Sequence, residues 1–178
     1  VYGRSKQAGE QALQASGAVA FILRTAWVYA AHGHNFLHTM LRLAGEREEL
    51  RIVADQVGSP TPADLIAEVT AALLARWRGL PAGERGAIQG LYHLTAAGAC
   101  SWFDFAQAIF DRAQAAGLLP RRPRVVPIAS ADYPTPAQRP AWSVLDCERL
   151  QTRFGLHLPA WEQGLCEVVD ALAAARSA

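Results

Sequence analysis

The sequence predicts an α/β fold, which we expect to be the last part of a doubly wound parallel sheet with a small α/β lobe attached. Apolar segments of strand length alternate with segments of helical composition along the 178 residues. Residues 19–28 form a nearly continuous apolar run, interrupted only by Arg24 and Thr25. Such a run is typical of a strand buried on both faces of a parallel sheet. After residue 50 the elements become shorter and less regular, which indicates the separate lobe.

Composition and end signals predict six helices. The first is rich in Ala, Gln and Glu and ends before Gly17. Another has Asp64 in its first turn, where a carboxylate suits the helix dipole. Ser101 and Asp104 form a capping-box pattern at the start of a third, which Gly117 ends. The predicted helices span residues 2–16, 36–45, 63–78, 101–116, 146–154 and 161–175.

Short strands and loops are predicted for the rest of the chain. Arg24 is unusual inside an apolar strand, and we expect a buried partner to satisfy it. Gly and Pro mark the loops, and three prolines make one of them extended and irregular. The predicted strands span residues 19–28, 51–57, 91–95 and 125–128, and the predicted loops span residues 30–35, 58–62, 79–90 and 133–140.

Composition and charge exclude several classes of protein. The chain is 51% hydrophobic and 19% charged, as in a globular domain with a sizeable core. Its net charge of +1 gives no strong attraction to nucleic acid or acidic lipid. We find no uncharged apolar run of transmembrane length and no leader-like segment. The three cysteines are widely spaced, which argues against a disulfide framework. We therefore expect a cytoplasmic protein with no nucleic-acid or membrane partner.

Tyr2 and Lys6 form the pattern that most clearly suggests chemistry. Lys6 is the only lysine among 17 basic residues. Residues spaced i, i+4 lie on one face of a helix, one turn apart. An ammonium group beside a phenol favours the phenolate form, so such a pair suits acid–base chemistry at a carbonyl or an alcohol. The spacing alone is common, and a solvated helix face would explain it equally well.

Five longer motifs give the pair a context. The segment YGRSKQAGE (2–10) resembles the active-site helix of extended short-chain dehydrogenases/reductases. The later motifs resemble, in order, segments of dTDP-4-dehydrorhamnose reductases. They are FILRTAWVYAAHGHNFLHTMLRLA (21–44), DQVGSPTPADLIA (55–67), LYHLTAAGACSWFDFA (91–106) and YPTPAQRPAWSVLD (133–146).

This resemblance implies the C-terminal part of a Rossmann-like reductase of a nucleotide-linked sugar. NADPH or NADH would deliver hydride to C4 of dTDP-4-dehydro-L-rhamnose, giving dTDP-L-rhamnose, a precursor of cell-surface polysaccharide. Tyr2 would protonate the sugar oxygen. Lys6 would hydrogen-bond the nicotinamide ribose and tune Tyr2, so both residues belong to the catalytic and the cofactor-binding sets.

Four further residues are predicted to bind the substrate. The resemblance implies that Trp27 packs on the sugar nucleotide. Asn35 could contact a phosphate or the sugar, although helix capping is the simpler account. Gln56 is expected to contact the substrate by resemblance. Arg139 is expected to clamp the diphosphate, because guanidinium matches phosphate oxygens bidentately; a carboxylate partner would serve it equally well.

Metal binding is predicted at one position only, Asp64. The three histidines at 32, 34 and 38 match no tetrahedral zinc spacing. Some reductases of the family carry magnesium at a dimer interface, and Asp64 occupies a matching position. Ala171 stands where a second carboxylate would be wanted, with Asp170 adjacent. This departure puts the magnesium in doubt.

The predicted domain division is residues 1–50 for the end of the dinucleotide-binding domain and residues 51–178 mainly for the sugar-nucleotide lobe, with some segments returning to the first domain. No GxxGxxG motif opens a helix in these residues. We therefore expect a fragment that lacks most of its cofactor site and is inactive alone. Its first strand should pair with the N-terminal half or with a second copy of the chain, and a homodimer is possible.

Two alternatives remain open at this point. The chain could belong to a non-catalytic regulatory subunit of the same family, against which the intact YxxxK and Trp27 motifs argue. It could also come from a related nucleotide-sugar epimerase or dehydratase, since its tyrosine would look the same.

Overall fold

The described part of the chain folds into six α-helices and eight short strands, as the α/β prediction requires. The computed structural model describes residues 1–133, 135, 137 and 139–177. The helices are α1 (Tyr2–Ala15), α2 (Phe36–Glu46), α3 (Ala63–Gly79), α4 (Trp102–Ala115), α5 (Glu148–Phe154) and α6 (Trp161–Ser177). Two 3₁₀ helices, η1 (Ala82–Ile88) and η2 (Ser130–Asp132), lie in the connections. All six predicted helices are confirmed, with shifts of at most two residues at their ends.

The strands form four separate pairs rather than one broad sheet. Three pairs are parallel: β1 (Phe21–Arg24) with β6 (Gly90–His93), β2 (Val28–Tyr29) with β5 (Thr61–Pro62), and β3 (Glu49–Val53) with β8 (Arg124–Ile128). The fourth pair, β4 (Val57–Gly58) with β7 (Cys100–Ser101), is antiparallel. Parallel pairs linked through helices are the arrangement that the alternating pattern predicted.

The prediction of one buried strand over residues 19–28 is wrong. The run divides into β1 and β2, which pair with different strands. The break falls at Trp27, whose φ of 50° takes the chain out of the extended conformation. Burial on both faces is also wrong for the described chain, because the residues of β1 are half-buried or exposed. Among the described strands, β1 pairs only with β6, so its other edge has no strand beside it.

Three other boundaries differ from the prediction. The strand predicted over residues 51–57 ends at Val53, and Val57 belongs to β4. Residues 58–62, predicted as a loop, include Gly58 of β4 and all of β5. The predicted linker 79–90 contains η1. These elements are only two residues long or 3₁₀-helical, and their pairing depends on distant segments, so local patterns do not reveal them.

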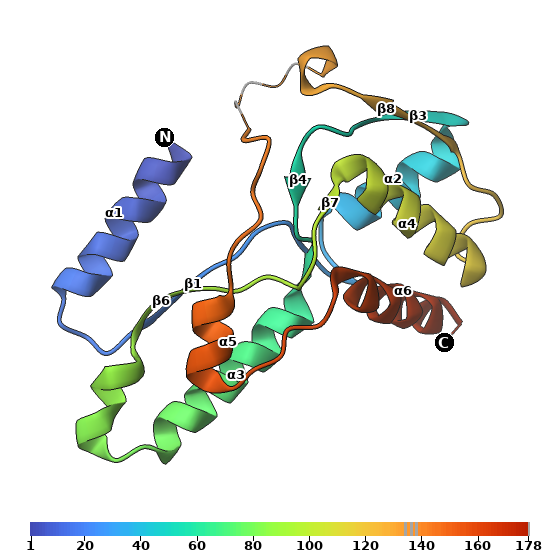
Figure 1. Ribbon diagram of the computed structural model, residues 1–178. Helices are drawn as coiled ribbons and strands as arrows, with labels where there is room; N and C mark the ends of the chain where they lie inside the picture. Colours follow the sequence, from blue (N-terminus) through green and yellow to red (C-terminus); the bar gives the residue numbers. More distant parts are fainter. Residues whose placement is uncertain (134, 136, 138, 178) are drawn as a thin grey trace.

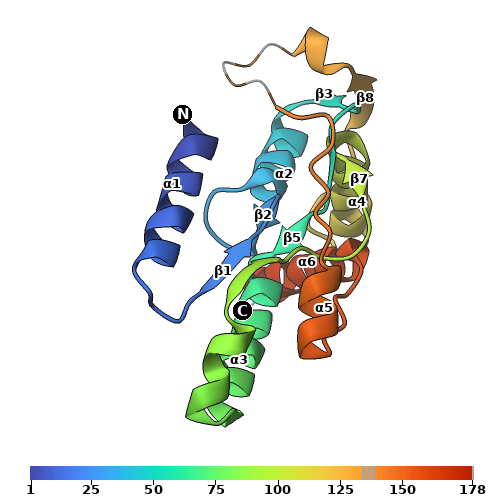
Figure 2. The ribbon, with the colours of Figure 1, turned by 60° about the vertical axis from the view of Figure 1, so that its left-hand side comes forward.

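The core lies between helices and the short sheets. Figures 1 and 2 show α2, α4 and α6 grouped on one side, with β3 and β8 next to α4. Four large side chains, Tyr29, Leu37, Phe105 and Phe110, are almost fully buried there. Cys100 and Cys147 are buried and Cys166 is half-buried, and all three are free thiols. No helix in the described part of the chain has the length and apolar character required to cross a bilayer.

Helix α1 stands apart from this core. It has no buried residue, and both ribbon views show it separated from the other helices. Glu10 links it to β1 by accepting two hydrogen bonds from Arg24, Nε at 2.8 Å and a terminal nitrogen at 2.6 Å. Arg24 therefore has the partner that we expected, although the partner is half-buried rather than buried: the Glu10 side chain is 16% exposed and that of Arg24 is 47% exposed.

Candidate active site and sugar-nucleotide site

Tyr2 and Lys6 lie at the beginning of α1, one turn apart, as their spacing predicts. The Lys6 ammonium nitrogen is 5.4 Å from the centroid of the Tyr2 ring, which is within the range of a cation–π contact. Tyr2 is 76% exposed. Both functional groups are therefore open to an incoming molecule. Their catalytic and cofactor-binding roles stay predictions.

Glu10 and Arg24 orient this helix relative to the sheet. The hydrogen bonds from Arg24 are the main reason that the pKa of Glu10 is lowered, and the same contact raises the pKa of Arg24. Paired guanidinium and carboxylate groups have a fixed planar geometry. The pair therefore links the middle of α1 to the end of β1.

Trp27 follows β1 and is held by contacts from distant segments. Its ring stacks on Trp102, with 3.5 Å between ring centroids and 6° between ring planes. Trp27 is half-buried and packs against the hydrophobic core. It therefore lies at the carboxyl end of a parallel strand, where open α/β sheets bind their ligands. Its contact with substrate stays a prediction.

Asn35 caps α2. Its side-chain oxygen accepts a hydrogen bond from the backbone N–H of His38 at 3.1 Å. Its amide nitrogen donates to the carbonyl oxygens of Ala30 at 3.0 Å and His32 at 3.2 Å. The simpler account, helix capping, is thus confirmed. Whether the amide also contacts a substrate stays a prediction.

Gln56 lies in a cluster centred on Ser130. Its amide nitrogen donates to the Ser130 hydroxyl at 2.8 Å. The neighbouring Asp55 carboxylate accepts hydrogen bonds from the Ser130 backbone N–H at 2.9 Å and from its hydroxyl at 2.6 Å. These bonds lower the pKa of Asp55. Gln56 therefore helps to fix the chain at η2, a partner that the sequence did not indicate.

Arg139 lies on the segment that follows η2, and the cluster of Asp55, Gln56 and Ser130 marks the start of this segment. The other end of the segment is fixed as well: the Val57 N–H donates to Ala141 at 2.8 Å, and the Ser143 N–H donates to Val57 at 2.8 Å. Arg139 is exposed and makes no ion pair with the described residues. The neighbouring positions 134, 136 and 138 of the predicted irregular segment lie outside the described residues.

Asp64 is in the first turn of α3, and Asp170 forms an ion pair with Arg112. Within the described part of the chain, no three His, Cys, Asp or Glu side chains lie close enough together to hold a metal ion. Magnesium binding through Asp64 stays a prediction.

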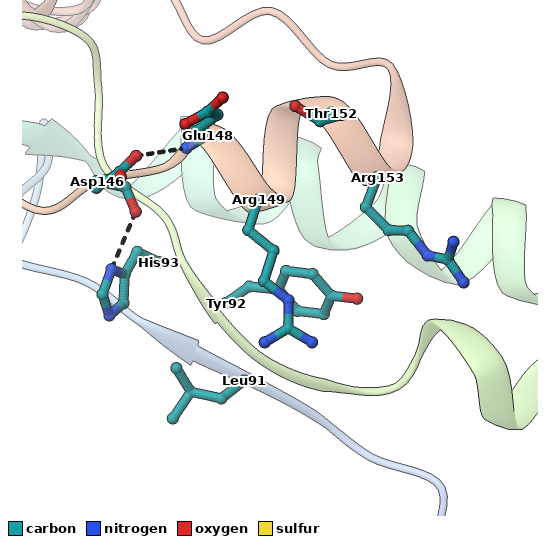
Figure 3. A pocket seen from close by; sticks show the side chains of 8 residues that line it. All are labelled: Leu91, Tyr92, His93, Asp146, Glu148, Arg149, Thr152 and Arg153. Atoms are coloured by element: carbon teal, nitrogen blue, oxygen red, sulfur yellow. Dashed lines mark hydrogen bonds between the residues drawn. The ribbon is translucent and has the colours of Figure 1, made fainter.

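A hollow of about 640 Å³ lies between β6 and α5 and contains none of the predicted site residues. Figure 3 shows Arg149 reaching down over the Tyr92 ring, with the guanidinium carbon 4.9 Å from the ring centroid. His93 Nδ1 lies 3.0 Å from the Asp146 carbonyl oxygen. A smaller hollow of about 200 Å³ lies between residues 95–98 and 144–148. Neither could be found from a motif.

The sequence was compared with known protein families and curated proteins. The model of the RmlD substrate binding domain family matches residues 1–174. A dTDP-4-dehydrorhamnose reductase of Burkholderia thailandensis is 51% identical over 170 residues, covering 93% of this chain and 56% of that protein. A dTDP-4-dehydrorhamnose reductase of Shigella flexneri is 44% identical over 172 residues, which cover 97% of this chain and 56% of that protein. The chain spans about half the length of the curated relatives it matches.

Solved structures show the same fold. A dTDP-4-dehydrorhamnose reductase of Bacillus anthracis, in complex with NADP, superposes with a TM-score of 0.82 at 36% identity, covering 94% of this chain and 54% of that one. A UDP-glucose-4-epimerase of Stenotrophomonas maltophila superposes with a TM-score of 0.70 at 19% identity, covering 99% and 55%. The second likeness concerns the fold alone. Together they place the fold among Rossmann-like α/β proteins, as predicted.

Proposed function

Because the chain belongs to the RmlD substrate binding domain family, we propose that it forms about half of a reductase of dTDP-4-dehydro-L-rhamnose. The reaction is hydride transfer from NAD(P)H to the C4 ketone, giving dTDP-L-rhamnose. The observation that carries this proposal is the intact Tyr2–Lys6 pair, open at the start of α1, in a chain similar over 97% of its length to a reductase.

Tyr2 is the proton donor of the proposed reaction. Hydride adds to C4, the carbonyl π electrons move onto O4, and the Tyr2 hydroxyl delivers the proton to that oxygen. The phenolate then recovers a proton from solvent. Lys6, within 5.4 Å of the ring, stabilises the negative charge that develops on the phenol.

The cofactor of the proposed reaction is NADPH or NADH, which supplies the hydride. The donor set fits such a group: a phenol and an ammonium lie side by side on a helix with no buried residue. Lys6 would hold the ribose hydroxyls, and Tyr2 would lie beside the nicotinamide. NADP is the ligand named for the Bacillus anthracis structure.

Residues from the lobe would bind the sugar nucleotide. Trp27 would pack on it, and the exposed guanidinium of Arg139 would pair with the diphosphate. Asn35 and Gln56 would contribute amide contacts, although each already has an intramolecular partner in the structure. These two assignments therefore require the amide to exchange or share its hydrogen bonds.

The proposal includes the domain division and the partners. Residues 1–50 would belong to the dinucleotide-binding domain and residues 51–178 mainly to the lobe, and the pairing of β6 with β1 is one return to the first domain. The edge of β1 that has no described partner would receive the N-terminal half of the protein or a second copy. Magnesium at Asp64 and a homodimer are parts of the same proposal.

Among the alternatives, a reductase is favoured over an epimerase. The curated relatives named as reductases are 44% and 51% identical to this chain, whereas the epimerase structure is 19% identical. A regulatory subunit would have no need of the Tyr2–Lys6 pair.

Steady-state NADPH oxidation by the full-length protein with the 4-keto sugar nucleotide tests the proposal. We expect Tyr2→Phe to lower kcat at least 100-fold, since positioned proton transfer contributes about 10²–10⁴-fold. Tyr133→Phe is the matched control, because Tyr133 is also exposed, at 58%, and should leave the rate unchanged. Full activity of Tyr2→Phe would overturn the assignment of the proton donor, and absence of turnover by the wild type would overturn the proposed reaction.

A further inference from the structure

We infer that Trp102 is a positioning residue that holds Trp27 as a fixed wall of the sugar-nucleotide site. The inference deepens the proposed function and rests on it for the identity of the ligand, a nucleoside diphosphate sugar. Its structural basis is independent of that function. It consists of a strained backbone at Trp27, a parallel stack of two indoles, and a glycine that leaves room for the stack.

The backbone of Trp27 adopts a conformation that a large side chain disfavours. Its φ is 50°, and it is the one non-glycine residue with positive φ in the described part of the chain. The Cβ atom of an L-residue crowds the backbone in this region, so surrounding contacts have to maintain it. The Trp27 carbonyl accepts a hydrogen bond from the Thr61 N–H at 3.1 Å, which secures the peptide after the residue. This bond leaves the position of the indole to other contacts.

Trp102 supplies one of these contacts. The two indoles are parallel within 6° with centroids 3.5 Å apart. Trp102 is also contacted by Phe36, with 4.5 Å between ring centroids. Because the two indole rings overlap face to face, Trp102 limits the rotation of the Trp27 side chain and keeps the Trp27 ring parallel to its own.

The position of Trp102 is itself fixed by the local structure. Trp102 is the first residue of α4, directly after Ser101, whose hydroxyl accepts a hydrogen bond from the Asp104 N–H at 3.1 Å. The Asp104 carboxylate accepts a hydrogen bond from the Ser101 N–H at 3.1 Å, which completes the capping box. In Figure 1 the chain passes from β7 into α4 beside β4. The capping box and the pairing of β4 with β7 therefore both fix the position of Trp102.

Gly58 of β4 closes the other side of the arrangement. A Cβ atom at Gly58 would lie 2.4 Å from Cε2 and 2.5 Å from Nε1 of Trp27, and 2.8 Å from the Ser143 hydroxyl oxygen. The Trp27 ring therefore lies between a tryptophan on one side and bare backbone on another. Both tryptophans remain half-buried, so part of the pair is open to a ligand.

The competing explanation is that the stack of Trp27 on Trp102 only stabilises the core and has no role in binding. The two explanations predict different results. If the stack serves only stability, its loss should lower the free energy of unfolding and leave ligand affinity unchanged. If Trp102 positions Trp27, its loss should weaken binding of the nucleotide and raise KM for the sugar nucleotide, with kcat nearly unchanged. The residue does not touch the reacting atoms in this account.

The first part of the experiment detects the stack directly in the full-length protein. Two stacked indoles give an exciton couplet in the far-ultraviolet circular dichroism spectrum. We expect Trp27→Phe and Trp102→Phe each to abolish this couplet. Trp77→Phe is the matched control, because Trp77 packs with Arg85 elsewhere in the chain and should leave the couplet intact. A couplet that persists in Trp102→Phe would overturn the inference.

The second part measures binding of dTDP, the probe, to the full-length protein. We expect Trp102→Ala to weaken binding by about three- to tenfold, the factor that an aromatic pair contributes. Trp102→Phe should recover most of the affinity, because a phenyl ring still offers a flat face. Trp102→Leu, which fills space without a flat ring, should bind as weakly as Trp102→Ala and provides the readout if Trp102→Ala does not fold. Wild-type dTDP affinity in Trp102→Ala or, where that variant does not fold, in Trp102→Leu would overturn the inference. If the wild type bound dTDP but did not reduce the 4-keto sugar, only the proposed reaction would fail.

Discussion

The close approach of Gly58 to Trp27 predicts a large effect from the smallest possible side chain. In Gly58→Ala the added methyl carbon would lie 2.4 Å from Cε2 and 2.5 Å from Nε1 of Trp27. Real Cβ atoms do not approach other heavy atoms so closely, so the indole or the strand has to move. Overpacking of this kind costs about 1–3 kcal/mol. Loss of the stack on Trp102 adds about 0.5–1.5 kcal/mol. We expect the free energy of unfolding to fall by about 1.5–4.5 kcal/mol in total.

Urea unfolding of the full-length protein, followed by circular dichroism, measures this effect. Gly45→Ala is the matched control, because Gly45 lies in α2 with no atom within 4 Å of an added Cβ. It should be neutral or stabilising by about 0.5–1 kcal/mol. In a Trp27→Ala background the clash with the indole no longer exists and only the 2.8 Å contact with the Ser143 hydroxyl oxygen remains, so Gly58→Ala should cost clearly less than it does in the wild type. A full cost of Gly58→Ala in that background would refute the reasoning.

Three further predictions concern individual contacts. Hydrogen bonds from Ser130 lower the pKa of Asp55. The stabilisation that these bonds give to the folded state should therefore be complete at any pH above the ordinary pKa of an aspartate. It should disappear as the pH falls through the lowered pKa of Asp55. Urea midpoints of the wild type and Asp55→Ala should therefore converge between about pH 5 and pH 2, and a constant difference would contradict the contact. Asn35→Ala should lower the free energy of unfolding by about 1 kcal/mol through loss of the helix cap, and Asn35→Ser should restore most of it in the same urea assay. Burial raises the pKa of the Cys100 thiol to about 12, so iodoacetamide should label the half-buried Cys166 first, as peptide mass spectrometry would show.

Local patterns predicted the helices well. The capping box of Ser101 and Asp104 is present as the sequence indicates, and it opens α4. Tyr2 and Lys6 also lie one turn apart, as their i, i+4 spacing predicted. Both residues belong to one helix, so their relative position depends on no other segment. The resemblance to a family of reductases was carried by motifs in sequence order, and the family comparison confirms it.

The features that the sequence missed depend on contacts between distant segments. Residues 19–28 read as one strand because their apolar pattern is nearly continuous, and tryptophan is not a residue from which positive φ is expected. The Trp27 ring stacks on Trp102, which lies far along the chain. Gln56 likewise finds its partner, Ser130, 74 residues away. No property of the neighbouring residues could have indicated either contact.

The most direct test of the account is the stereospecific transfer of deuterium from 4-deuterated NADPH to the sugar by the full-length protein. With dTDP-4-dehydro-L-rhamnose as substrate, the account predicts one deuterium at C4 of the product, detected by mass spectrometry and NMR. Tyr2→Phe should lower the rate of this transfer at least 100-fold, and Tyr133→Phe should not. A wild-type protein that binds the sugar nucleotide but transfers no deuterium would contradict the proposed function. A wild-type rate in Tyr2→Phe would contradict the role of the Tyr2–Lys6 pair.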